Sequence, residues 1–109
     1  MKNIIDFLTE ASAYFKWGCK YISQNDFIKI AKEVMKKSHI QPDEIQEEIS
    51  QYEDPDDLWD AYDHGKLTNY SEFEENMLNA LAKNNKYADN KENIMDYFYG
   101  EAYDILDLI

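Results

Sequence analysis

Arginine is absent from this chain of 109 residues, and cysteine, glycine and proline are scarce. Without arginine the protein has no planar guanidinium group that could hold a phosphate or a carboxylate through two parallel hydrogen bonds. The single cysteine, Cys19, cannot form an internal disulfide, as is usual in a reducing compartment. With three glycines and two prolines, the chain has too few turn residues for the many tight turns of an all-β fold.

Long apolar runs are also absent. The chain contains no stretch of about 18 apolar residues, the length that a membrane-spanning helix needs. Near the N-terminus, Asp6 interrupts the apolar run that a secretory signal would require. We therefore expect a cytoplasmic protein that has no contact with a membrane.

Motifs for catalysis and for metal or cofactor binding are missing as well. The three glycines lie far apart, so none belongs to a phosphate-binding loop. The acids from Asp54 to Asp60 lack the central glycine and the final glutamate of an EF-hand, and no further His or Cys near Asp60 and His64 completes a zinc shell. Cys19 lies in an apolar segment, where a lone cysteine is usually a small core residue. We expect no enzyme, no cofactor and no metal site.

The composition is that of a folded protein, since 44% of the residues are apolar and 15% are aromatic. At this length the chain predicts one domain over residues 1–109. Apolar residues recur at helical spacing in six segments, which we expect to be helices. They run from Asn3 to about Ser23, Ser23 to Lys37, Pro42 to Tyr52, Asp54 to Gly65, Ser71 to Asn84 and Asp89 to Ile109.

The predicted fold is therefore a compact all-α bundle of five or six short amphipathic helices. Helix starts are expected at Ser23 and at Asp54 with Pro55, and Ser71 with Glu74 forms a capping box. A small hairpin would fit best at residues 66–70. The apolar stripe of Ile94–Ile109 makes the last helix either central to the fold or part of an interface.

The formal net charge is −12, and most of it lies in the segment Asp43–Asp63, which we call the acidic ridge. Its 21 residues hold ten of the 23 acidic side chains and no lysine. Along one straight helix these carboxylates would average one per ~3 Å, close to the one phosphate per ~3.4 Å of a DNA strand. Because Asp54 and Pro55 start a new helix, the charges should instead form a patch on two helices.

Repulsion within the acidic ridge suggests a role for it. Like charges at helical spacing, such as Glu44 with Glu47 and Glu48, destabilise a helix by a few tenths of a kcal/mol per pair, and a cationic partner would relieve them. Tyr52, Trp59 and Tyr62 lie among the acids, and such side chains are enriched at interface hot spots. The predicted partner-binding residues are Glu44, Glu47, Glu48, Glu53, Asp54, Asp56, Asp57, Asp60, Asp63, Tyr52 and Trp59.

The main hypothesis is an inhibitor that mimics nucleic acid and occupies the basic groove of a nucleic-acid-handling protein. Small acidic anti-restriction or anti-CRISPR proteins of phages and mobile elements are expected to act in this way. Direct binding to nucleic acid is disfavoured, because phosphate groups need a cationic surface and the cluster from Lys29 to Lys37 is modest.

Three alternatives stay open. An immunity protein that neutralises a basic nuclease toxin would need the same surface chemistry. An oligomeric adaptor would use Ile94–Ile109 to form a homodimer or to dock a partner helix. In the third alternative, the acidic ridge is only a solvated face that keeps the protein soluble, and its aromatic residues belong to the core, as is common at helical spacing.

Overall fold

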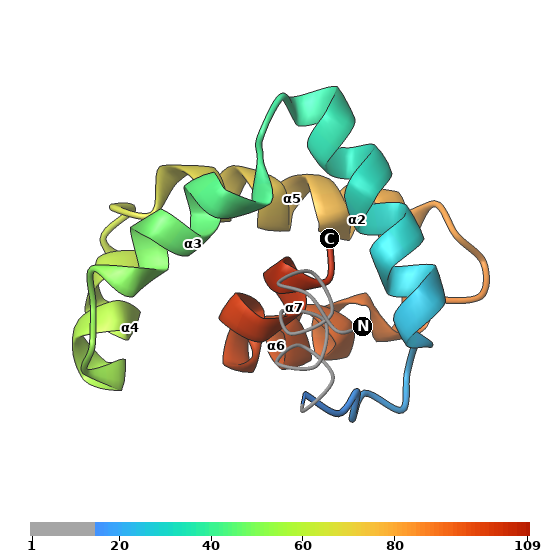
Figure 1. Ribbon diagram of the computed structural model, residues 1–109. Helices are drawn as coiled ribbons and strands as arrows, with labels where there is room; N and C mark the ends of the chain where they lie inside the picture. Colours follow the sequence, from blue (N-terminus) through green and yellow to red (C-terminus); the bar gives the residue numbers. More distant parts are fainter. Residues whose placement is uncertain (1–14) are drawn as a thin grey trace, which may run out of the picture.

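The computed structural model describes residues 15–109, and these form helices and connecting segments without any strand (Figure 1). The all-α prediction is confirmed. The helices are α2 (Gln24–Ser38), α3 (Pro42–Ser50), α4 (Pro55–Asp63), α5 (Thr68–Ala82), the short 3-10 helix η1 (Ala88–Asn90), α6 (Lys91–Gly100) and α7 (Ala102–Asp107). The hairpin considered at residues 66–70 is not formed, because α5 already begins at Thr68.

Helix α5 is the central element of the fold. It passes behind α2 and α3 in Figure 1 and contacts both of them as well as α6, while α7 packs against α3. Phe98 of α6 lies in the middle of the core, with ring centroids of Phe27 at 5.5 Å, Phe73 at 5.3 Å and Tyr70 at 6.0 Å. Each such fully buried ring contributes about 1.5–3 kcal/mol through removal of apolar surface from water.

The start of α2 agrees with its local signal. Ser23 caps the helix, and its hydroxyl accepts a hydrogen bond of 3.2 Å from the backbone N–H of Asp26. The helix ends at His39, whose φ of 58° is in the left-handed region, and the N–H of Ile40 then donates to the carbonyl of Met35 at 3.1 Å. Ile40 is buried behind this turn.

The predicted helix from Asn3 to Ser23 is wrong for the part that the structure describes, and its first residues lie outside that part. Residues 15–23 are irregular. The indole N–H of Trp17 donates to the carbonyl of Ile22 at 2.9 Å, and the N–H of Gly18 donates to the Tyr97 hydroxyl at 2.7 Å. The bond to Tyr97 attaches the segment to α6, and both bonds use backbone groups that a helix would have paired internally.

The C-terminal helix is two helices, not one. The helix is interrupted after Gly100, at Glu101, whose φ of −126° and ψ of 24° are not helical. Glycine is among the weakest helix formers, so the break falls at a position of low propensity. On both sides of it the apolar stripe is buried, as in Ile94, Phe98 and Ile105.

Candidate functional site

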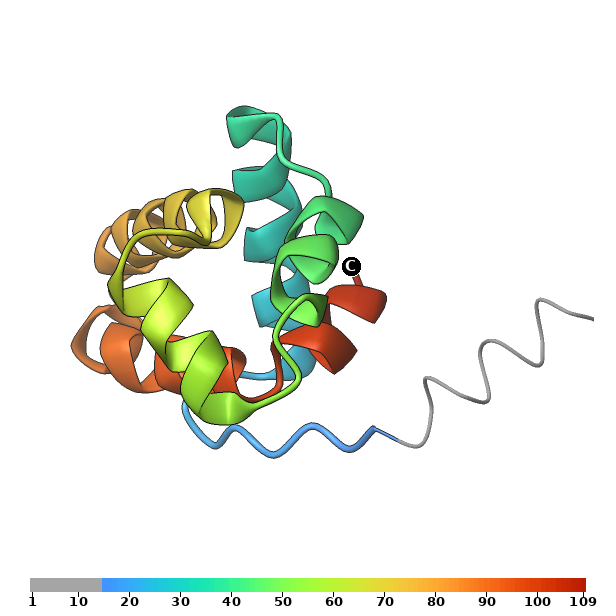
Figure 2. The same ribbon diagram turned by 90° about the vertical axis from the view of Figure 1, so that its left-hand side faces the viewer.

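The acidic ridge covers α3, α4 and the short connection between them. The two helices lie at the same end of the molecule, which faces the viewer in Figure 2. Pro42 and Pro55 each occupy a first helical position, and acids follow both of them in the first turn, where the helix dipole favours negative charge. Every carboxylate of the acidic ridge is exposed except that of Glu48.

Three predicted partner-binding residues have structural roles. The Glu44 carboxylate accepts a hydrogen bond of 3.0 Å from the backbone N–H of Gln41, and Asp54 accepts one of 2.8 Å from the N–H of Asp56. Glu48, a predicted partner-binding residue, instead reaches α5 and accepts from the backbone N–H groups of Asn69 and Tyr70, each at 2.9 Å. These carboxylates cap helices, so their charges are partly used within the fold.

The remaining ridge carboxylates are unengaged within residues 15–109. None of them forms a side-chain hydrogen bond or an ion pair with another described residue, although all are exposed. They are Asp43, Glu47, Glu53, Asp56, Asp57, Asp60 and Asp63. No lysine or backbone N–H group among the described residues therefore pairs with the charge of these seven side chains.

The aromatic residues of the acidic ridge differ in exposure. Trp59 is 53% exposed, whereas Tyr52 and Tyr62 are half-buried. The Tyr62 hydroxyl donates to Glu74 at 2.5 Å, and this hydrogen bond, together with burial, raises the pKa of Tyr62 to about 12. Trp59 packs edge-on against Tyr99 of α6, with ring centroids 6.1 Å apart. The large exposed ring fits a binding surface, while Tyr62 joins α4 to the core.

Two depressions flank α4. One of about 400 Å³ is lined by Tyr52, by Asp57 and Asp60 of α4, and by His64, which follows this helix. The other, of about 230 Å³, lies between α3, α4 and the turn that joins α6 to α7. This second hollow was not predicted, and its lining includes Tyr99 and the exposed Tyr103. The hollow forms where three segments far apart in the sequence meet, so it has no local sequence signal.

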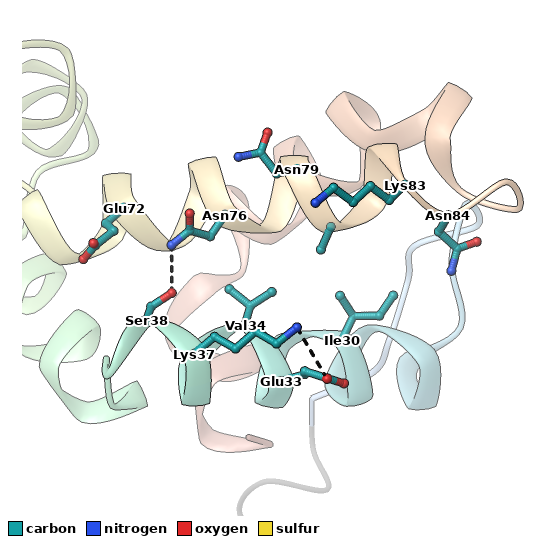
Figure 3. A pocket seen from close by; sticks show the side chains of 11 residues that line it. Ile30, Glu33, Val34, Lys37, Ser38, Glu72, Asn76, Asn79, Lys83 and Asn84 are labelled. Carbon is teal, nitrogen blue, oxygen red and sulfur yellow. Dashed lines mark hydrogen bonds and ion pairs between the residues drawn. The ribbon is translucent and has the colours of Figure 1, made fainter.

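A larger groove of about 650 Å³ lies away from the acidic ridge, between α2 and α5 (Figure 3). Asn76 donates to the Ser38 hydroxyl across it at 2.7 Å, and Lys37 pairs with Glu33 at 3.7 Å. Its lining mixes lysines, glutamates and asparagines over an apolar floor. Because the lining charges have both signs, this groove indicates no particular class of ligand.

The apolar residues of Ile94–Ile109 that would form a homodimer are mostly core residues of a single copy. Ile94, Phe98 and Ile105 have no exposed surface. A dimer through this region would have to use the apolar and aromatic side chains that are still exposed or half-buried. They are Tyr97, Tyr99, Tyr103, Leu108 and Ile109.

Two further features bear on the site. Residues 15–109 contain no group of three or more His, Cys, Asp or Glu side chains placed to hold a metal ion. None of the described helices combines the length and apolar character of a membrane span.

Comparison with family models, curated proteins and solved structures gave no match to the chain. The surface chemistry of the acidic ridge is therefore the basis on which a function can be assigned.

Proposed function

We propose that the protein is an inhibitor that binds a basic nucleic-acid-handling protein through the acidic ridge and so blocks the groove in which that protein holds nucleic acid. The observation that carries the proposal is the set of exposed carboxylates on α3, α4 and the connection between them that have no partner among residues 15–109, beside the exposed Trp59. Solubility alone does not account for this concentration of carboxylates, because like charges at these spacings destabilise a helix.

Electrostatic attraction would make such binding fast and sensitive to salt. Surfaces of opposite charge steer encounter, and this steering weakens as ionic strength rises. Trp59 would provide the apolar contact that charge alone lacks. Two kinds of basic partner meet this chemistry, a defence effector that acts on foreign nucleic acid and a nuclease toxin, for which the protein would serve as the immunity protein.

A pair of charge-reversal variants tests the proposal. The first changes Asp56, Asp57 and Asp60 to Lys. The matched control changes Glu75, Asp89 and Glu92 to Lys, which alters the net charge equally at exposed positions outside the acidic ridge. Both triplets include acids near the start of a helix, so their effects on helix stability should be comparable.

The assay is affinity capture from a lysate of the source organism, elution with a salt gradient and identification by mass spectrometry. We expect the wild-type protein and the control variant to retain a nucleic-acid-binding protein that elutes as salt rises and that double-stranded DNA displaces. The ridge variant should lose it while keeping its circular dichroism spectrum. Equal capture by both variants would exclude the acidic ridge as the binding surface.

A further inference from the structure

The hollow between α3, α4 and the α6–α7 turn has the chemistry of a receptor for one side chain. Its volume is about 230 Å³. Ile49 and Leu58 supply apolar surface from α3 and α4, Tyr99 and Tyr103 supply aromatic rings, and Glu101 and Asp104 supply carboxylates. No lysine or histidine lines it.

The break between α6 and α7 leaves this hollow open. Gly100 lies at the break, and a Cβ atom built on it would meet no atom within 4 Å. The glycine thus faces free space, which a longer side chain could occupy without a clash. Its φ is not in the left-handed region, so other residues can adopt this backbone conformation.

Exposed aromatic surface concentrates around the hollow. Within residues 15–109 the exposed large hydrophobic side chains are Tyr21, Trp59 and Tyr103. Tyr103 lines the hollow, and Trp59 contacts its other aromatic wall, Tyr99. A clustering of exposed rings beside a concave site is typical of interface hot spots.

From this combination we propose that the hollow receives an arginine side chain of the basic partner, an inference that rests on the proposed function. The planar guanidinium stacks on aromatic rings and pairs with carboxylates, which Tyr103, Glu101 and Asp104 would provide. The methylene groups of the arginine would pack on Ile49 and Leu58. Lysine, a compact and strongly hydrated cation, would use the rings and the carboxylates less well.

Two peptides and two substitutions test this inference on the full chain. The peptides are N-acetylated hexa-arginine amide and the corresponding hexa-lysine amide, titrated at low salt and followed by amide NMR shifts. Gly100→Met would place a longer side chain at the wall of the hollow without changing charge. Gly100→Ala is the matched control, since it raises helix propensity in a similar way but leaves the hollow largely empty.

We expect the arginine peptide to bind about threefold more tightly than the lysine peptide and to shift the amides of Gly100 and Tyr103. Gly100→Met should abolish the preference, and Gly100→Ala should keep it. Equal affinity for both peptides, or a preference unchanged in Gly100→Met, would overturn the arginine site. The arginine site could be overturned in this way while the acidic ridge is still the binding surface. In that event the ridge variant of Asp56, Asp57 and Asp60 would no longer bind either peptide.

Discussion

The Glu48 carboxylate lies at the start of α5, where one of its oxygens accepts a hydrogen bond of 2.9 Å from the backbone N–H of Tyr70. The second oxygen accepts from the N–H of Asn69 at the same distance. Leu67, the residue before the helix, has no side-chain group that could cap it. A carboxylate from α3 thus performs the capping that a local Ser or Asp would normally supply, and its charge is favourable beside the positive end of the helix dipole.

Replacement of Glu48 by Ala should therefore destabilise the fold. We expect the free energy of unfolding in urea to fall by about 1–2 kcal/mol, because two backbone N–H groups lose their acceptor. Glu47→Ala is the control, since this neighbour is exposed and has no side-chain partner within the described residues, so its effect should stay within about 0.5 kcal/mol. Equal effects of the two substitutions would show that the cap contributes nothing to stability.

His39 should be a site of stabilisation. It is the residue with positive φ other than glycine in the described part of the chain, and a side chain in this conformation costs free energy that glycine avoids. His39→Gly should raise the free energy of unfolding by about 1 kcal/mol, measured by urea denaturation. His39→Ala keeps the strain and should show no such gain, and a loss of stability in the glycine variant would contradict the expectation.

The hydrogen bond from Tyr62 to Glu74 predicts a loss of stability at alkaline pH. The folded protein raises the pKa of Tyr62 from 10.0 to about 12, so the bond contributes fully below pH 10 and is lost as the pH rises toward 12. Tyr62→Phe should be less stable than the wild type near neutral pH, and this difference should shrink between pH 10 and 12. Urea unfolding at several pH values measures this difference in the free energy of unfolding. Tyr21→Phe is the control, because it does not remove the hydrogen bond from Tyr62 to Glu74.

Removal of the Tyr70 hydroxyl should have the opposite effect on stability from removal of the Tyr62 hydroxyl. Its ring is buried, its hydroxyl has no hydrogen-bond partner within residues 15–109, and burial raises its pKa. A buried hydroxyl without a partner costs free energy, so Tyr70→Phe should leave the free energy of unfolding unchanged or raise it by up to about 1 kcal/mol. Thermal unfolding by circular dichroism checks this result. A marked loss of stability would mean that the hydroxyl has a partner after all.

The parts of the fold that the sequence predicted are those with local signals. Ser23 and the pair Asp54 and Pro55 lie next to the helices they start, and both starts are confirmed. The start of α5 was misplaced to Ser71 because its cap, Glu48, lies about 20 residues earlier in the chain. No local pattern reveals a contact of this kind.

The same distinction holds for the site. Exposure of the carboxylates could be expected from their type and spacing, and all but Glu48 are exposed. The spacing of Trp59 is more typical of a core residue, and its 53% exposure depends on how α4 packs. Which carboxylates cap helices and which are unengaged depends on distant partners. The hollow beside Gly100 depends on the packing of three helices, so no sequence pattern could locate it.

Helix α4 buries a single residue, Ala61, and its other attachments are partly exposed side chains. They are Leu58, the half-buried ring of Tyr62 against Tyr70 and Tyr99, and Trp59 against Tyr99. An element with so little buried surface opens locally more often than the core around α5, and its amide protons should exchange with solvent sooner. A partner that binds α4 would suppress this local opening of the helix. Slowed deuterium uptake along Pro55–Asp63 would then record binding even where the rest of the molecule stays unchanged.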